Sequence, residues 1–168
     1  MVISPGTSGL SEAVAAAVAS ASAILPTDYT VDTLPDPAQN LDRYARVVDL
    51  FGMKRDLVLA SKVGMMSFWQ PVRPIFATSQ VVSSNMTLTP LKTPSVLYLT
   101  GNLPGVVNLT LSSTYAYPGA SFEVAFDGSL GLFSLNLVGL YAGAVLSLIA
   151  GGRRRVFWDL STGSWKQF

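Results

Sequence analysis

The sequence predicts a mostly β fold, a short-stranded antiparallel β-sandwich or barrel-like domain with an N-terminal helical arm. Beyond about residue 40, short runs of β-branched, aromatic and leucine residues alternate with clusters of Gly, Pro, Asn and Ser. Before residue 26, an alanine-rich segment repeats its larger apolar residues at helical spacing. We therefore expect a helix and connector in residues 1–37 and a β-domain in residues 38–168.

The predicted helix runs from Ser8, a suitable N-cap, to Leu25, and Pro26 is expected to end it. Residues 27–38 are polar and contain prolines, so they are interpreted as a connector that separates the helix from the β-domain. Removing residues 1–33 is therefore expected to leave a folded β-domain. The narrow apolar stripe of the helix supplies the candidate partner-binding residues, which are Leu10, Val14, Val18, Ala21 and Leu25. Packing of the stripe on its own domain and pairing with another chain both remain open.

Ten strands are expected along the β-domain, and two pairs of them form hairpins. The first hairpin turns at Phe51-Gly52, and the last turns at residues 161–164 and places Trp158 beside Trp165. The expected strands are Arg43 to Leu50, Asp56 to Ala60, Phe68 to Val72, Gln80 to Leu88, Val96 to Leu99, Val106 to Leu111, Ser121 to Phe126, Phe133 to Val138, Arg154 to Trp158, and Trp165 to Phe168.

The stretch from Ser129 to Gly152 contains no charged residue, and Arg153, Arg154 and Arg155 follow it. A hydropathy scan would suggest a transmembrane helix here. The first half instead alternates, with Phe133, Leu135 and Leu137 on one face, which is typical of a strand. We therefore expect no membrane partner. The second half is predicted as a buried strand or a short helix.

The composition narrows the possible functions. The 168 residues suit one domain, and only 12% are charged while 49% are hydrophobic, so apolar surface must be buried inside the fold or against partners. The net charge of +1 provides no general attraction for nucleic acid. The chain has no histidine and no cysteine, which excludes disulfides, thiol nucleophiles, imidazole bases and the usual zinc ligand sets. We expect no cofactor, no metal and no enzymatic activity.

Three groups of residues could carry chemistry, and each has a simpler structural interpretation. Glu123 and Asp127 lie on one face of a predicted strand and could serve a small carbohydrate-active enzyme, although exposed strand positions are favoured. Successive arginines in a strand point to opposite faces, so residues 153–155 are expected in a solvated hairpin facing an acidic partner. The tryptophans Trp69, Trp158 and Trp165 are expected to pack in the core more readily than to stack on sugars.

Several segments share a pattern of turn and strand residues with one known class of protein. They are Leu34 to Asn40, Arg43-Tyr44, Asp49 to Gly52, Arg55 to Leu59, Trp69 to Pro74, Met86 to Leu91, Leu97 to Gly101, Ala116 to Ala120, Val156 to Asp159, and Gly163 to Trp165. Together these segments resemble a module of small structural proteins of tailed bacteriophages, of the head-decoration, head-fibre and tail-fibre types. The resemblance spans roughly residues 34 to 168.

This resemblance implies a location in the virion, many copies per particle, no cofactor and no catalytic residues. The first hypothesis is a capsid-associated decoration, cement or head-fibre protein that forms a homo-oligomer, expected to be a trimer, and binds the major capsid protein or another virion protein. The alternative is a tail-fibre or tail-tip protein that binds a host receptor. Low charge and high apolar content agree with burial of surface between identical chains.

Overall fold

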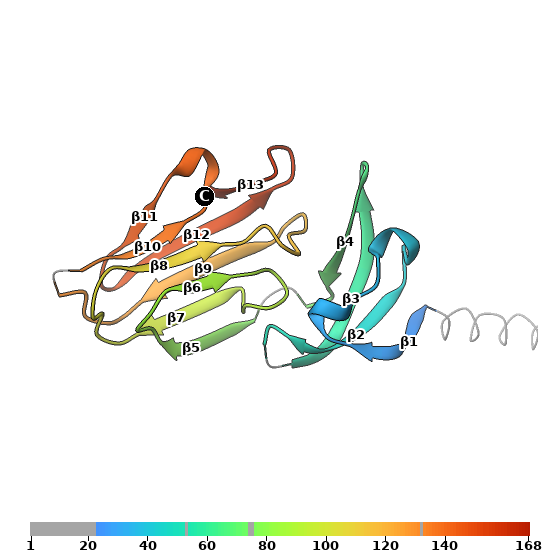
Figure 1. Cartoon of the computed structure of the whole chain (residues 1–168), viewed down its shortest axis with the longest axis horizontal. Coiled ribbons are helices and arrows are strands. Elements are labelled where there is room, and N and C mark those ends of the chain that lie inside the picture. The colour runs from blue at the N-terminus through green and yellow to red at the C-terminus, as the bar shows by residue number, and fades with distance from the viewer. Residues whose placement is uncertain (1–22, 53, 74–75, 132) are drawn as a thin grey trace, which may run out of the picture.

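The computed structural model describes residues 23–52, 54–73, 76–131 and 133–168 (Figure 1). These residues form three β-sheets. A four-stranded sheet holds β1 (Ile24–Tyr29), β2 (Tyr44–Leu50), β3 (Lys54–Val63) and β4 (Met66–Pro71) in that order. It lies on the right in Figure 1, and the other two sheets lie together on the left, where they form a sandwich.

The sandwich consists of one five-stranded sheet and one four-stranded sheet. The five-stranded sheet has the order β13-β12-β9-β7-β5, and the four-stranded sheet has the order β11-β10-β8-β6. Their bounds are β5 (Ala77–Val81), β6 (Met86–Leu88), β7 (Val96–Thr100), β8 (Val107–Leu111), β9 (Ser121–Phe126), β10 (Leu135–Val138), β11 (Leu146–Leu148), β12 (Gly152–Asp159) and β13 (Ser164–Gln167).

From β5 to β10 the chain crosses from one sheet of the sandwich to the other at every step. Neighbouring strands in each sheet therefore run parallel, and they form three stacked rungs, β5–β6, β7–β8 and β9–β10. Leucines fill the interior between the rungs, including Leu97, Leu109 and Leu137, each 0% exposed. At one corner Gly128 packs against Gly101, where an added Cβ would overlap the Gly101 carbonyl oxygen.

The prediction of antiparallel sheets is therefore only partly correct. In the described residues five strand pairs are parallel and five are antiparallel. Parallel neighbours need a crossover connection, and in the sandwich each crossover is a strand of the opposite sheet, whereas β1 and β2 are joined through two 3-10 turns, η1 (Val31–Thr33) and η2 (Pro37–Gln39). Short strands separated by turns are compatible with either arrangement, so local patterns do not distinguish them.

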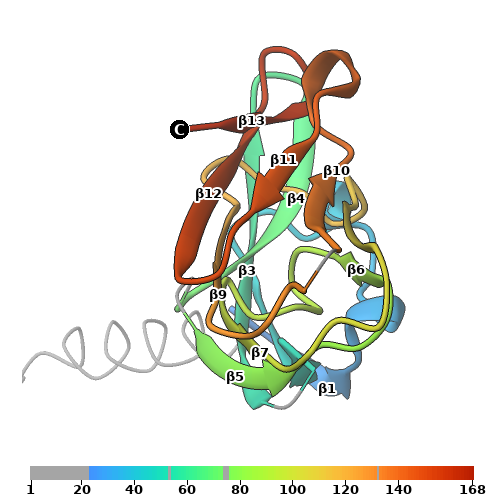
Figure 2. The same cartoon turned by 90° about the vertical axis from the view of Figure 1, so that its left-hand side faces the viewer.

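The last strands close one end of the stack by antiparallel pairing. β11 pairs with β10, β12 pairs with β9, and β13 pairs with β12 (Figure 2). A row of polar side chains supports the outer face of the four-stranded sheet. Asn136 donates to Asn108 Oδ1 at 3.4 Å, and Ser147 donates to Asn136 Oδ1 at 2.8 Å, so the row crosses three strands.

The N-terminal predictions need correction where the described residues begin. Residues 24–29 form β1, which pairs in parallel with β2, so the predicted helix does not extend to Leu25. Leu25 is 4% exposed and belongs to the core, and Pro26 lies within an edge strand, where a missing N–H is tolerated. The connector interpretation also fails, because Val31 is 1% exposed. The other predicted stripe residues, Leu10, Val14, Val18 and Ala21, lie outside the described residues.

Most other strand predictions are confirmed to within a few residues. The run from Gln80 to Leu88 is an exception, because it divides into β5 and β6, which belong to different sheets. The uncharged stretch from Ser129 to Gly152 contains β10, the 3-10 turn η3 (Tyr141–Gly143) and β11. In the part of the chain that the structure describes, no helix is long and apolar enough to cross a membrane.

Candidate partner-binding surface

The outer face of the five-stranded sheet carries the arginines of β12. Val156 and Trp158 point into the core at 0% and 8% exposure, while Arg153 and Arg155 on the opposite face are exposed. Arg154 lies on the inner side of the strand, in register with the buried Val124. The prediction that these three arginines do not form one patch is therefore confirmed.

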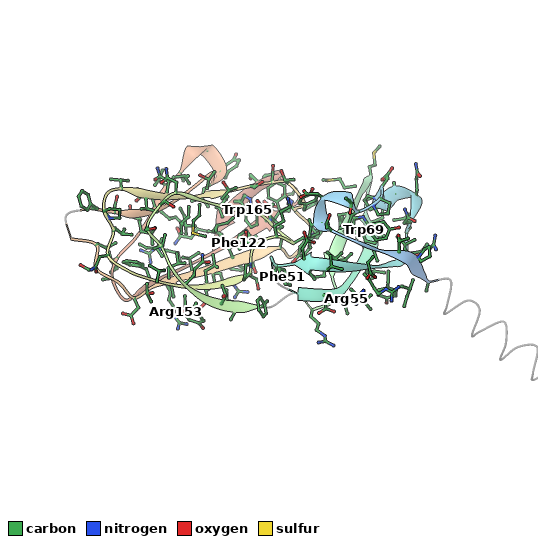
Figure 3. All side chains as sticks on the ribbon, turned by 60° about the horizontal axis from the view of Figure 1, so that its bottom comes forward. Phe51, Arg55, Trp69, Phe122, Arg153 and Trp165 are labelled. Atoms are coloured by element: carbon green, nitrogen blue, oxygen red, sulfur yellow. The ribbon has the colours of Figure 1, made fainter. Side chains whose placement is uncertain are left out.

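Aromatic side chains accompany the two outward arginines. The Arg153 guanidinium lies 5.7 Å from the centre of the Tyr98 ring, and the Arg155 guanidinium lies 4.5 Å from the Phe168 ring. Phe168 also packs on Phe157, with ring centroids 4.6 Å apart. We call this surface the arginine–aromatic face, and its residues are Tyr98, Glu123, Arg153, Arg155, Phe157 and Phe168. Arg153 is labelled on the sandwich in Figure 3.

The arginine–aromatic face has an excess of positive charge. Glu123 pairs with Arg153 at 3.3 Å, and no carboxylate in the described residues lies within ion-pair distance of Arg155. Nearby Asp159 is already paired, because Lys166 and Ser161 bond to it and hold its pKa well below the usual range. Arginine and exposed aromatic residues are enriched in protein interfaces. The face therefore suits a partner that presents carboxylates between apolar groups.

The terminal hairpin anchors the sheet that carries this face, because its tryptophans pack in the core. Trp158 and Trp165 are in register on β12 and β13, and their rings pack edge to face with centroids 5.6 Å apart. Trp165 also packs on Phe122 at 5.3 Å and donates from Nε1 to the Ser112 carbonyl at 3.1 Å (Figure 3). The prediction that the two tryptophans share one hydrophobic cluster is confirmed.

A second candidate region is the junction between the first sheet and the sandwich. Phe51, Leu91 and Tyr115 all have positive φ angles, of 56°, 66° and 59°. Bulky residues rarely adopt this conformation, so surrounding contacts must maintain it. Phe51 N–H donates to the Leu91 carbonyl at 2.6 Å, which joins the β2–β3 turn to the loop before β7. The first sheet and the sandwich therefore meet at a contact that these backbone conformations and the hydrogen bond fix in place.

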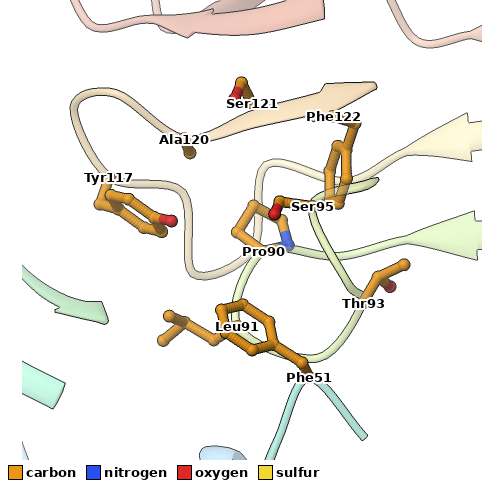
Figure 4. A pocket seen from close by; sticks show the side chains of 9 residues that line it. All are labelled: Phe51, Pro90, Leu91, Thr93, Ser95, Tyr117, Ala120, Ser121 and Phe122. Carbon is orange, nitrogen blue, oxygen red and sulfur yellow. The ribbon is translucent and has the colours of Figure 1, made fainter. Parts of the chain in front are cut away.

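The cavities at the junction include a small space and a larger open cleft. Figure 4 shows the side chains lining the smaller one, of about 10 Å³, which include Phe51, Leu91 and Tyr117. Burial raises the pKa of Tyr117 to about 12, so this phenol stays neutral. The larger cavity, of about 300 Å³, is an open cleft lined by Pro35, Trp69 and Tyr115 among others. Trp69 is 6% exposed and donates to the Pro35 carbonyl at 2.8 Å, so it supports the cleft wall.

An ion-pair network spans the same junction and predicts a pH dependence. Lys92 bonds to Asp32 at 2.6 Å and the Tyr115 hydroxyl donates to Asp32 at 2.8 Å, and both contacts lower the pKa of Asp32. Because the folded-state pKa is lowered, this stabilisation is present at neutral pH and is lost as the pH falls below about 4. We expect Asp32→Asn to lower the melting temperature more at pH 7 than at pH 3. An equal shift at both pH values would contradict this role, and the exposed network implies a small shift.

The other candidate residues from the sequence do not come together at one place in the described structure. Glu123 pairs with Arg153, and Asp127 lies four positions further along the extended chain, about 13 Å away, beyond the roughly 5 to 10 Å that glycosidase carboxylates span. No group of three or more metal-ligating side chains occurs among the described residues. Sequence reasoning missed Tyr98 and Phe168 as companions of the arginines. The alternation within β7 places Tyr98 outward, but only the sheet order brings it to Arg153.

Comparisons with known proteins do not identify the chain. No family model matches it, and no curated protein matches it. One similar solved structure is described as a chaperone-substrate complex; it is 14% identical, covers 74% of this chain and has a TM-score of 0.42. This chain spans 24% of that chain's length. A likeness at that TM-score carries no argument about function.

Proposed function

We propose that this protein is a structural component of a tailed-phage particle, a capsid-associated decoration, cement or head-fibre protein that self-associates and binds the major capsid protein. The proposal rests on the contact between the segments that resemble phage structural proteins. Segments that lie far apart in the sequence supply Pro35, Phe51, Trp69, Leu91 and Tyr117, and all five line the small space or the open cleft at the junction. These segments therefore pack together in space, as the parts of one module would.

The arginine–aromatic face provides the partner surface in this proposal. It lies on the sandwich and belongs to a sheet whose inner side is buried, so its side chains are held in place when a partner arrives. Pre-organised side chains lose less conformational entropy on binding. A capsid surface with exposed carboxylates would neutralise Arg155, because its cross-strand neighbour Glu123 pairs with Arg153 instead.

Charge reversal on this face tests the proposal. We expect Arg155→Glu to keep the fold with a slightly lower stability, because the new carboxylate lies opposite Glu123 on β9, and to lower binding to purified particles by about tenfold or more, as loss of a central arginine does in other interfaces. Co-sedimentation with particles lacking the protein measures the binding. Arg73→Glu is the matched control, because Arg73 is an 82% exposed arginine outside the sandwich sheets. Equal binding by Arg155→Glu and the wild type would refute the assigned surface.

The second candidate function is a tail-fibre or tail-tip protein that binds a host receptor. The open cleft beside Trp69 and Tyr115 favours it, because aromatic and proline walls with serine hydroxyls suit a sugar or a short peptide. Locating the protein in a reconstruction of the particle separates the two candidates. Density on the capsid supports the first, and density at the tail supports the second.

A further inference from the structure

The first rung leaves one end of the sandwich open. β5 has β7 as its ladder neighbour and β6 has β8, and no described strand pairs with their other edges. Both edges belong to the same rung and end their sheets at the same side of the stack. In Figure 1, β5 lies at the lower margin of the sandwich. The stack therefore ends in two neighbouring strand edges, which have no sheet partner for their outward backbone groups.

These edges carry none of the charges, strand prolines or bulges that usually prevent pairing with another chain, and of the two β5 is the longer, with five residues against three in β6. Natural edge strands are protected by lysine, proline, bulges or a covering element. Residues 76–91 contain no charged residue, and their one proline, Pro90, lies after β6. The register of β5 with β7 is regular from Ala77 to Val81, and Val81 is 73% exposed. The edge of β5 is thus flat, uncharged and accessible.

The interior at this end is also incomplete. Thr78 and Gln80 occupy the positions that Leu97 and Leu99 fill in the next rung. A cavity of about 300 Å³ opens beside Thr78, Gln80 and Met86, and Phe51 and Gly52 of the β2–β3 turn and Lys92 form its other wall. Threonine and glutamine side chains both donate and accept hydrogen bonds, so two such ends can satisfy each other's polar groups.

Two-fold symmetry matches both edges at once. A two-fold axis perpendicular to the sheets would place β5 antiparallel to β5 of a second copy and β6 antiparallel to its counterpart, so both sheets would continue across the contact. Residues near such an axis meet their own copies, and a charged strand would repel itself. The uncharged run of residues 76–91 meets this condition.

The opposite end of the stack does not offer a matching surface for head-to-tail growth. Its edges are β11 and β13, and β13 carries Lys166 paired with Asp159, so this end is charged where the edges of β5 and β6 are not. A closed contact between identical ends is therefore favoured over an open filament.

We infer that the open end formed by β5 and β6 is a self-association surface, at which two copies of this chain join edge to edge across a two-fold axis. This inference rests on the self-association in the proposed function, but it concerns a different surface from the capsid-binding face. Loss of the contact would change the mass in solution, whereas loss of the capsid contact would change particle binding. The two failures are distinguishable.

A charge placed at the centre of β5 tests the inference. Ser79 is exposed in the middle of this strand, so Ser79→Lys would set two ammonium groups against each other across the axis. We expect sedimentation velocity on the full chain to show half the wild-type mass for Ser79→Lys and for Ser79→Glu. An equimolar mixture of the two variants should regain the wild-type mass, because opposite charges then face each other.

The matched control is Thr110→Lys, an exposed hydroxyl residue on the central strand β8. This variant should keep the wild-type mass, and circular dichroism should show the same β spectrum for all four proteins. A wild-type chain that is monomeric at every concentration would overturn the inference. Two other results would also overturn it, an unchanged mass for Ser79→Lys or a mixture that stays at half mass.

Discussion

Trp165→Ala should lower the free energy of unfolding by about 3 to 5 kcal/mol, as truncation of a large buried aromatic residue does in other cores. Trp165 is 1% exposed and packs on both Phe122 and Trp158. Its Nε1 hydrogen bond to Ser112 links the terminal hairpin to the opposite sheet. Chemical denaturation of the variant measures the loss, and a change below about 1 kcal/mol would show that the ring is not a core element.

A pair of phenylalanine substitutions separates packing from hydrogen bonding in this cluster. Trp165→Phe removes the donor to Ser112 and leaves a carbonyl unpaired, whereas Trp158→Phe removes an Nε1 that has no partner in the described structure. Both changes remove a similar volume from the same cluster. We expect Trp165→Phe to cost about 1 kcal/mol more than Trp158→Phe. The reverse order would show that ring volume alone governs stability here.

Removing residues 1–33 should severely destabilise the protein, whereas removing residues 1–22 should leave it folded. The longer deletion takes away β1 together with Leu25 and Val31, which are 4% and 1% exposed. Each buried aliphatic side chain contributes about 1.5 to 3 kcal/mol, a large share of the roughly 5 to 15 kcal/mol that stabilises a typical domain. It also removes Asp28, which pairs with Arg46 and Arg55 on the first sheet.

Thermal unfolding of the two truncated proteins measures this difference. The chain starting at Ala23 keeps the contacts of β1, so its cooperative transition should stay close to that of the full chain. The chain starting at Leu34 should melt at a much lower temperature or show no cooperative transition. Equal melting temperatures would show that β1 is dispensable. Particle binding by the shorter deletion then tests whether residues 1–22 form the attachment arm, without the loss of fold that the longer deletion brings.

Sequence patterns predicted the elements with strong local signals. The β2–β3 hairpin, β9 and the terminal hairpin with its tryptophan pair are confirmed, because alternation and turn residues are local properties. β1 was missed because an alanine-rich segment with helical spacing precedes it and Pro26 lies within it, so its order comes from pairing with β2 rather than from a local strand pattern. β11 was left undecided because its three residues are too few to show a period.

The sequence by itself determined that the chain is rich in short strands, places its three tryptophans in a core, and lacks histidine and cysteine chemistry. Only the tertiary structure decided which strands pair, that β5 to β10 alternate between two sheets, and that Tyr98 lies beside Arg153. The physical reason is that side-chain alternation needs only neighbouring residues, whereas strand order depends on contacts between residues far apart in the chain. Both surfaces proposed for binding depend on that strand order, and neither was predictable from local patterns.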